Sequence, residues 1–318
     1  MQPIPAAIPE PLRNFLAEVR EVKRCRVAAG YRHTATNARE AMEGMTRRYV
    51  TRIPPVPLIR DELVPGHDYL VPVRLYHPAP GEERPVALFA HGGGHVGGSV
   101  SIYDAIARKL ALASGWIIAS VEYRLAPECP YPSALKDLVA CIKGIFDVLR
   151  RAEPPIAFAP RLALIGDSGG GALCASAAHL AQYDPEVAVE RQVLIYPSLD
   201  YSLSQPSVME NGEGLLLERA RILWYFDCYL HQAENRRAAS PLFMDLSPGY
   251  PATLVVTAQF CPLRDEGLAY VERLRRAGIA CEHVGYPGQI HAFLNLEDLD
   301  PETCADLYRR IGDFLAAP

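Results

Sequence analysis

The feature that most constrains this chain is a repeated alternation of short apolar runs with amphipathic segments of helical period. The strand-like runs lie at 58–64, 70–76, 85–90, 116–121, 161–165, 192–196, 253–257 and 281–286. The helical patterns lie at 11–29, 35–48, 103–114, 132–151, 168–182, 219–229, 265–277 and 301–315. Strands that are wholly apolar, and that alternate with helices, belong to parallel sheets covered on both faces. We therefore predict an α/β fold with a mostly parallel central sheet between two layers of helices.

Two parts of the chain do not follow the alternation. Residues 1–50 contain only helical patterns, and residues 199–235 are irregular apart from one helix-like segment. Prolines between residues 51 and 57 separate the first part from the strands, because proline cannot continue a helix. We expect residues 1–50 and 199–235 to form a smaller unit that packs on a domain made of residues 51–198 and 236–318.

Composition excludes several classes of protein. The chain of 318 residues carries a net charge of −5, which gives no electrostatic reason to bind nucleic acid or an anionic membrane. The longest nearly apolar run, residues 171–181, is shorter than the roughly 18 residues that a transmembrane helix needs, and the first ten residues lack the pattern of a signal peptide. Eight scattered cysteines without metal-ligand spacing predict reduced thiols in a cytoplasmic protein, with no metal or organic cofactor.

The first motif with chemical meaning is Gly166-Asp167-Ser168-Gly169-Gly170, which fits the pattern G-x-S-x-G. It follows an apolar strand and opens a helix, which is the context that a nucleophilic serine requires. Glycines allow strand and helix to approach closely at such a turn, and the start of the helix favours negative charge near the serine. The motif makes Ser168 the candidate nucleophile.

A second motif, His91-Gly92-Gly93-Gly94, follows the strand at 85–90. Consecutive glycines leave backbone N–H groups free to point at an anion, such as the oxyanion of a tetrahedral intermediate. A flexible turn or a phosphate-binding loop are the alternatives. No Lys-Ser or Lys-Thr pair follows the glycines, so the phosphate interpretation is weak.

A serine nucleophile needs a base, and in this kind of fold the base follows the serine in the chain. Four histidines do so: His179, His231, His283 and His291. His179 falls inside the helix after the serine and His283 inside a strand-like run, where structural roles are more common. His231 lies in the irregular segment. His291 lies in a loop after a strand, where catalytic side chains of α/β proteins are usually found, and we favour it as the base.

Together these motifs resemble the hormone-sensitive-lipase-like group of α/β hydrolases, close to bacterial acetyl esterases. The matching segments follow one another in the family's order and together are highly specific. They are His91 to Gly94, Tyr123-Arg124-Leu125-Ala126-Pro127-Glu128, Gly166 to Gly170, Cys261-Pro262-Leu263-Arg264-Asp265-Glu266-Gly267 and Tyr286-Pro287-Gly288-Gln289-Ile290-His291-Ala292-Phe293.

The resemblance implies an α/β-hydrolase fold and a hydrolase with Ser168 as nucleophile and His291 as base. It implies oxyanion donors at Gly93, Gly94 and Gly169, and it makes the segment from Tyr123 to Glu128 a support for the glycine loop. It also implies that the smaller unit is a helical cap over an acyl pocket. A preference for short acyl chains and a possible homodimer follow from the resemblance alone.

One position departs from the family pattern in a way that affects the chemistry. The family segment begins Asp-Pro-Leu-Arg-Asp-Glu-Gly, and its first Asp orients and charge-compensates the histidine; here that position is Cys261. A neutral thiol does not stabilise the imidazolium that forms on His291. Replacing the acid of a comparable triad by its amide costs about 10⁴ in turnover. Two smaller departures are Glu122 in place of Asp, which keeps the charge, and Gly169 in place of Ala, which keeps the N–H.

Four interpretations of Cys261 are open at this stage. Activity survives but is reduced, because serine, histidine and oxyanion donors remain. Another carboxylate takes over, with Asp200 the first candidate and Asp265 and Glu266 less suitably placed. Cys261 itself is ionised, or oxidised to a sulfinate that resembles a carboxylate. Finally, the chain is a disabled or altered hydrolase that binds a ligand without turnover.

From these observations we predict a serine carboxylesterase that hydrolyses small uncharged esters with short acyl chains through an acyl-enzyme, weakened by Cys261. A ligand-binding protein on the same fold is the alternative. A peptidase or amidase is less favoured, because an amine is harder to expel and the triad is weakened. The aromatic run 224–226 in the expected cap could limit the pocket, although aromatic residues at helical spacing are more often part of a core.

Overall fold

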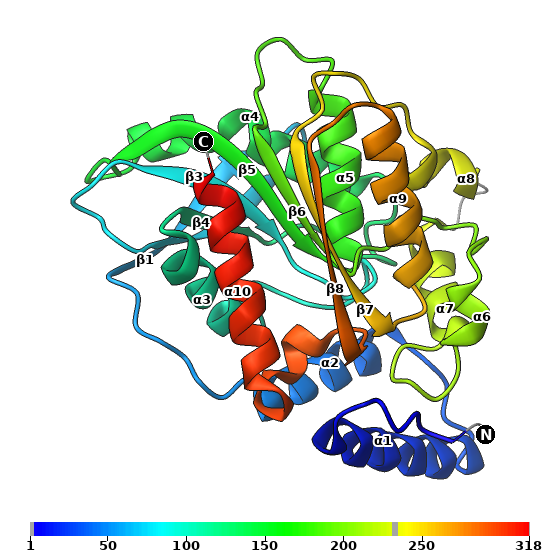
Figure 1. The fold of residues 1–318 in the computed structure, drawn as a ribbon. Coiled ribbons are helices and arrows are strands. Elements are labelled where there is room, and N and C mark those ends of the chain that lie inside the picture. Colours follow the sequence, from blue (N-terminus) through cyan, green and yellow to red (C-terminus); the bar gives the residue numbers. More distant parts are fainter. Residues whose placement is uncertain (1–2, 231–234, 318) are drawn as a thin grey trace.

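A mixed sheet runs through the centre of the protein in the computed structural model, which describes residues 3–230 and 235–317 (Figure 1). Its strand order is β1-β2-β4-β3-β5-β6-β7-β8. The strands are β1 (Leu58–Pro65), β2 (Leu70–His77), β3 (Arg84–Ala90), β4 (Ile117–Val121), β5 (Phe158–Asp167), β6 (Arg191–Ile195), β7 (Ala252–Phe260) and β8 (Cys281–Ile290). β2 is antiparallel to β1 and β4, whereas all the other neighbouring strands are parallel. This is the predicted α/β architecture.

Helices cover both faces of the sheet (Figure 1). The larger ones are α1 (Glu10–Ala28), α2 (Ala35–Tyr49), α3 (Asp104–Ser114), α4 (Ser133–Arg151), α5 (Gly169–Ala181), α7 (Arg219–Tyr229), α9 (Arg264–Arg276) and α10 (Pro301–Ala316). Short helical turns are α6 (Ser207–Glu210), α8 (Arg236–Ala239), η1 (Pro241–Phe243) and η2 (Phe293–Leu299). One core lies between the sheet and α3 with α10, and the other between the sheet and α4, α5 and α9.

Successive side chains of a strand point to opposite faces of the sheet, which explains why there are two cores. In β3, Ala87 and Phe89 face the first core, whereas Val86 and Leu88 face the second, and all four side chains are completely buried. A strand can be apolar at every position only when both faces of its sheet are covered. The short apolar runs of the sequence therefore predicted both the strands and the two helical layers.

The last strand is longer than its apolar run suggested. β8 continues beyond residue 286 to Ile290, across Pro287 and Gly288. Proline is tolerated here because β8 is an edge strand, and its pairing with β7 is irregular between Ala258 and Phe260. As a result His291 follows directly on the strand, with no intervening loop.

The described residues of the two segments outside the alternation lie together near the carboxyl ends of the strands. In Figure 1, α2 lies just below the ends of β7 and β8, and α1 runs along the lower side of the molecule. The apolar face of α1, including Leu12 and Leu16, forms a third cluster with Leu215 and Leu296. Residues of the first and the second segment thus share a core, which is what a joint cap requires.

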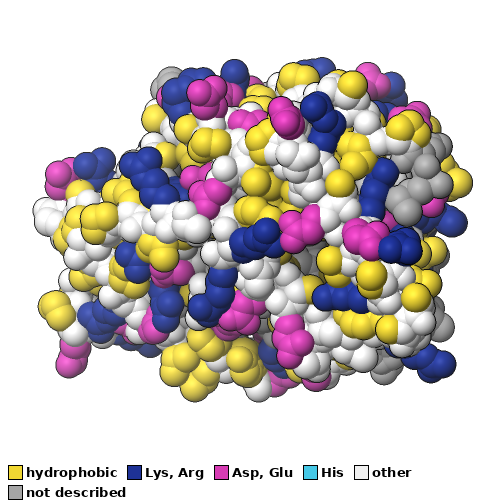
Figure 2. Space-filling view, turned by 90° about the horizontal axis from the view of Figure 1, so that it is seen from below, with side chains coloured by type: hydrophobic (Ala, Val, Ile, Leu, Met, Phe, Trp, Pro, Cys, Tyr) yellow, Lys and Arg dark blue, Asp and Glu magenta, His cyan; other side chains and the backbone are white. Residues whose placement is uncertain are grey.

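Acidic and basic side chains are interspersed on the side from which α1 and α2 are seen, with apolar patches between them (Figure 2). An ion pair joins Arg48 of α2 to Glu18 of α1 at 2.8 Å. Within the described residues, no helix is both long enough and apolar enough to cross a membrane.

Candidate active site

Ser168 lies in the sharp turn between β5 and α5. Its backbone adopts φ 53° and ψ −118°, a conformation that L-residues rarely adopt, and such strain is frequent at functional sites. A Cβ on Gly170 would lie 2.0 Å from the carbonyl oxygen of Ala90, and one on Gly166 would lie 2.4 Å from the oxygen of Gly170. The glycines of the motif are therefore required by close packing of helix α5 against the sheet, as the sequence predicted.

Three predicted residues meet at the carboxyl ends of three parallel strands. The Oγ of Ser168 lies 3.0 Å from Nε2 of His291, which follows β8. The other ring nitrogen, Nδ1, lies 3.2 Å from Sγ of Cys261, which follows β7. All three side chains are almost completely buried, with exposed fractions of 8%, 5% and 0% for the serine, histidine and cysteine. The arrangement is a line of serine, imidazole and thiol.

Burial keeps both the imidazole and the thiol neutral. It lowers the pKa of His291 to about 3 and raises the pKa of Cys261 far above its ordinary value. For Nε2 to accept the proton of Ser168, Nδ1 must carry a hydrogen, which it donates to Sγ. Sγ also accepts the backbone N–H of Leu263 at 3.3 Å. The thiol can thus orient the ring as an acceptor but adds no negative charge.

The carboxylates considered as substitutes for the missing acid are engaged elsewhere. Asp200 accepts the backbone N–H groups of Ser202 and Ser204, each at 2.9 Å, and both of their hydroxyls. Among the described residues, the hydrogen-bonding partners of the His291 ring are the serine and the cysteine. The geometry gives no support to Asp200 as the orienting acid.

The two acids nearer to the cysteine in sequence also point elsewhere. Asp265 accepts the backbone N–H of Ser207 at 2.9 Å and the guanidinium of Arg264 at 2.7 Å. Glu266 accepts the backbone N–H of Leu199 at 2.6 Å, and burial raises its pKa well above the ordinary value. Neither carboxylate takes the place that Cys261 occupies beside the histidine.

The glycine loop with two of the predicted oxyanion donors packs against Gly169, the residue after the serine. A Cβ on Gly169 would lie 3.2 Å from the backbone nitrogens of both Gly94 and His95, so the glycine loop after β3 packs on the start of α5. In the described part of the chain, the N–H groups of Gly93 and Gly94 have no hydrogen-bond acceptor. Gly169 is the first residue of α5, where the N–H has no partner within the helix. These donors are free to bind a negatively charged oxygen.

Neighbouring side chains hold the start of the glycine loop. The hydroxyl of Tyr123 donates to the carbonyl oxygen of His91 at 2.6 Å, and the two rings stack with centroids 4.3 Å apart. The N–H of Gly92 donates to Asp167 at 2.6 Å. These contacts fit the supporting role that the resemblance implied for the segment beginning at Tyr123.

Two residues near the site were not found by sequence reasoning. Asp167, completely buried beside the serine, also accepts the hydroxyl of Tyr103 at 3.0 Å, and burial raises its pKa to about 7. The ring of Tyr196 meets the ring of His291 edge-on, with centroids 4.9 Å apart. Asp167 could have been noticed as the variable position of the serine motif, whereas nothing in the sequence singles out Tyr196.

The other histidines have structural contacts. Nδ1 of His179 lies 2.9 Å from the carbonyl oxygen of Asp245, and Nε2 of His283 lies 2.9 Å from the hydroxyl of Thr257. His231 lies outside the described residues. In residues 3–230 and 235–317, no group of three or more His, Cys, Asp or Glu side chains is placed to hold a metal ion.

The aromatic residues 224–226 of α7 contribute to a core and also cover the glycine loop. Phe226 is buried in the core, whereas the ring of Tyr225 covers Gly94: a Cβ on that glycine would lie 2.6–2.9 Å from the ring carbons. Trp224 packs beside Tyr225 with centroids 5.2 Å apart. The prediction that the run belongs to a core is correct, because Phe226 is part of the first core and Trp224 and Tyr225 pack against it. Tyr225 also covers the glycine loop.

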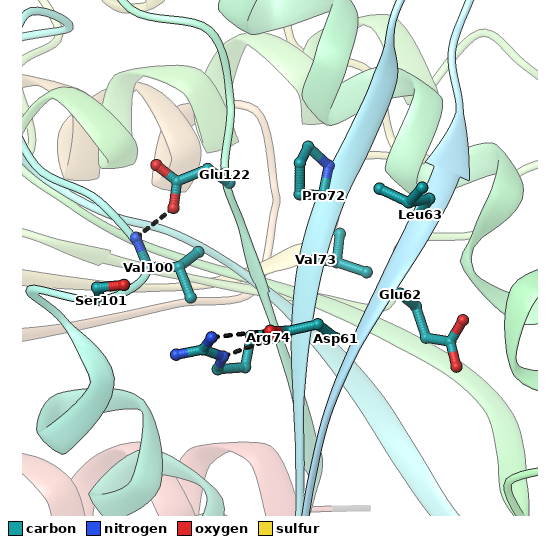
Figure 3. Close-up of a pocket in the computed structure, with 9 residues that line it drawn as sticks. All are labelled: Asp61, Glu62, Leu63, Pro72, Val73, Arg74, Val100, Ser101 and Glu122. Carbon is teal, nitrogen blue, oxygen red and sulfur yellow. Dashed lines mark hydrogen bonds and ion pairs between the residues drawn. The ribbon is translucent and has the colours of Figure 1, made fainter.

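A surface groove on the opposite part of the sheet is separate from this site. It is lined by residues of β1 and β2, among them Asp61 and Arg74, and by Val100 and Glu122 (Figure 3). The carboxylate of Glu122 accepts the N–H of Val100 at 2.7 Å, so it fixes the far end of the glycine loop. The groove contains none of the residues around Ser168.

Comparisons with known proteins show which family the chain is similar to. Residues 87–295 match the family described as alpha/beta hydrolase fold. The chain is 35% identical over 245 residues to ethyl acetate hydrolase of Pseudomonas putida, which covers 75% of each chain. It is 34% identical over 275 residues to carboxylesterase NlhH of Mycobacterium tuberculosis, which covers 82% of this chain and 84% of that protein.

Solved structures are similar over nearly the whole chain. A hyperthermophilic esterase from the archaeon Pyrobaculum calidifontis superposes with a TM-score of 0.81 and 32% identity, covering 92% of this chain and 97% of the esterase. An ester hydrolase from the metagenome of Lake Arreo gives a TM-score of 0.87 and 30% identity, covering 97% and 98%. The chain therefore belongs to the hormone-sensitive-lipase-like family of α/β hydrolases, and it is a carboxylic ester hydrolase.

Proposed function

We propose that this esterase hydrolyses small uncharged esters with short acyl chains through an acyl-enzyme on Ser168. The observation that carries the proposal is the 3.0 Å separation between the serine Oγ and Nε2 of His291, a contact across which a proton can transfer. The strained turn that holds Ser168 supports the proposal, as does the packing of the glycine loop on Gly169 at the start of α5. We propose that the N–H groups of Gly93, Gly94 and Gly169 bind the oxyanion.

In the first half-reaction the Oγ of Ser168 attacks the ester carbonyl carbon while Nε2 of His291 takes the hydroxyl proton. The carbonyl oxygen becomes an oxyanion, which the backbone N–H groups of the glycine loop and of Gly169 stabilise. The intermediate then collapses, the imidazolium returns its proton to the departing alcohol, and the acyl group stays on the serine. Water attacks the acyl-enzyme by the same route and releases the acid.

Cys261 sets the efficiency of both half-reactions. The imidazolium of His291 forms in a buried site that disfavours charge, which is the cause of its pKa of about 3. The thiol offers a hydrogen-bond acceptor at 3.2 Å but no opposite charge. We therefore propose an enzyme whose turnover is reduced relative to one with a carboxylate at this position.

Two observations support small esters as the substrates: the position of Tyr225 in the proposed cap, and the activity named for one relative. Residues 1–50 and 199–235 form the proposed cap, in which Tyr225 lies directly over Gly94 and narrows the space beside the oxyanion donors. A relative at 35% identity is an ethyl acetate hydrolase. Both support small substrates. A homodimer and a cytoplasmic location stay predictions from the sequence.

The test is kcat/KM for p-nitrophenyl acetate and for esters of longer acids, with Ser168→Ala as the blank. We expect a rate clearly above the blank for acetyl and butyryl esters, falling for octanoyl esters. His291→Ala should match the blank, while the matched variant His179→Ala, which alters a histidine far from the site, should keep the wild-type rate.

The alternative is a protein that binds a ligand without turnover, which the neutral thiol of Cys261 would favour. A fluorophosphonate probe separates the two, because only an activated serine reacts rapidly with it. Labelling that is lost in Ser168→Ala supports the esterase. A wild-type protein that neither labels nor exceeds the blank rate would support the binding protein.

A further inference from the structure

The glycine loop that carries the proposed oxyanion donors has few hydrogen bonds of its own. Within the loop, the N–H groups of Val96 and Gly97 donate to the carbonyl oxygen of Gly93 at 3.2 and 2.9 Å. The carbonyl oxygens of His95 and Val96 point outward and are bound by other segments. Tyr123 and Asp167 hold the start of the loop and Glu122 its far end, so the contacts of these two carbonyls fix its middle part.

Arg39 of helix α2 binds one of these carbonyls directly and the other through Ala126. The Nε of Arg39 donates to the oxygen of Val96 at 2.8 Å. The oxygen of His95 accepts the N–H of Ala126 at 2.9 Å, and the oxygen of Ala126 in turn accepts Nη2 of Arg39 at 3.1 Å. A single guanidinium thus connects the N-terminal helices, the glycine loop and the segment that supports it.

A carboxylate fixes the direction of this guanidinium. Nη1 and Nη2 of Arg39 form a bidentate ion pair with Glu128, at 2.9 and 2.6 Å. The glutamate side chain is 58% exposed, so the ion pair by itself adds little to the stability of the fold. Its geometry matters more, because a planar fork held by a carboxylate can reach two carbonyl oxygens in fixed directions, which a lysine ammonium cannot do.

We propose that Arg39 is a positioning residue for the reaction: it sets the place of the oxyanion donors through Val96 and Ala126. This inference rests on the proposed function of the glycine loop. Oxyanion donors act on charge that develops in the transition state, so a displaced loop lowers kcat and changes KM little. A purely structural arginine would instead change the unfolding midpoint and leave kcat of the folded enzyme intact.

The test compares Arg39→Met with Arg48→Met, using p-nitrophenyl acetate, and records kcat, KM and the unfolding midpoint. Arg48 is also on α2 and also pairs with a glutamate, Glu18 at 2.8 Å, but that pair lies on the surface between α1 and α2. We expect Arg39→Met to lower kcat about tenfold to a hundredfold with KM within about threefold, less than the outright loss of one donor. Arg48→Met should keep the wild-type kcat.

Two further variants test the proposal if Arg39→Met does not fold. Arg39→Lys retains the charge but reaches one carbonyl at most, so its kcat should fall between wild type and Arg39→Met, and Glu128→Gln should lower kcat less than Arg39→Met. A wild-type kcat in folded Arg39→Met or Arg39→Lys overturns the inference. Failure of the proposed function is recognised separately, because wild type would then equal Ser168→Ala.

Discussion

Cys261 and His291 are in hydrogen-bonding contact, with Sγ 3.2 Å from Nδ1, on the side of the imidazole opposite Ser168. The thiol occupies the place of the acid in a serine–histidine–carboxylate arrangement. It has the acceptor atom that fixes the ring but not the charge that stabilises an imidazolium. This relationship leads to predictions for the pH dependence of the reaction, for the turnover rate and for the effect of placing a carboxylate at position 261.

The dependence of kcat/KM on pH should show that no negative charge lies beside His291. Burial lowers the pKa of His291 to about 3, so we expect this proposed base to be neutral, and active, well below pH 6.5. In Cys261→Asp a carboxylate beside Nδ1 favours the imidazolium and raises that pKa. The acidic limb of kcat/KM should therefore lie at higher pH in the variant than in wild type. Rates between pH 4 and 9 check this: kcat/KM should fall towards acid in the variant within this range, whereas that of wild type should not. Profiles of the same shape would contradict the prediction.

Asp200 should prove dispensable for the chemistry. Its carboxylate is bound by the N–H and hydroxyl groups of Ser202 and Ser204, and an amide in its place would lose part of these bonds. We expect Asp200→Asn to lower the free energy of unfolding by about 1–3 kcal/mol. The kcat of the folded variant should stay within about threefold of wild type, since no group that acts on His291 has changed. A loss above a hundredfold in a folded variant would make Asp200 the orienting acid after all.

Gly94 should tolerate no side chain. Its φ is 62°, and a Cβ would collide with the ring of Tyr225. Since removal of one oxyanion donor costs about 10²–10³ in turnover, we expect Gly94→Ala to lower kcat/KM at least about a hundredfold.

Two further variants identify the cause of that loss. A methyl group added to Gly44 of α2 would have nothing within 4 Å of it, so Gly44→Ala should leave the rate unchanged. Adding Tyr225→Ala to Gly94→Ala should recover part of the activity by removing the collision. An active Gly94→Ala enzyme would show that this glycine loop does not bind the oxyanion.

Acid should destabilise the fold through its buried neutral histidines. Burial lowers the pKa of His91 to about 4 and of His95 to about 3, below the value of about 6.5 in an unfolded chain. Their contribution to stability is therefore complete above pH 6.5 and is lost as the pH falls towards the folded-state values. Between pH 7 and pH 5, the free energy of unfolding should fall by about 2 kcal/mol less in His95→Phe than in wild type. Urea unfolding at both pH values measures the difference; equal losses would refute the assignment.

Local sequence patterns were sufficient to predict most of the fold, and they singled out the candidate residues that the structure brings together around Ser168. The apolar runs located every strand, and the two glycine motifs located Ser168 and the loop after β3. His291 could be chosen among four histidines because a residue just after a strand lies at the catalytic edge of the sheet. The extension of β8 was not predicted, since it depends on the freedom of an edge strand to accommodate Pro287.

Contacts between distant segments could not be read from the sequence. Arg39 reaches Val96 and Glu128, which are 57 and 89 residues away, and nothing in its neighbourhood distinguishes it from the other arginines of α2. The same is true of Tyr196 beside His291. Such roles arise only when the cap helices, the glycine loop and the strand ends are packed together.

The most direct test of the account is the ester hydrolysis rate of Cys261→Asp beside Cys261→Ser. Aspartate restores the charge opposite the imidazolium, whereas serine restores only a neutral hydrogen-bonding group. We predict that kcat/KM for p-nitrophenyl acetate rises at least about a hundredfold in Cys261→Asp and stays near wild type in Cys261→Ser. A folded Cys261→Asp enzyme that is no faster than wild type would contradict the claim that the thiol limits this esterase.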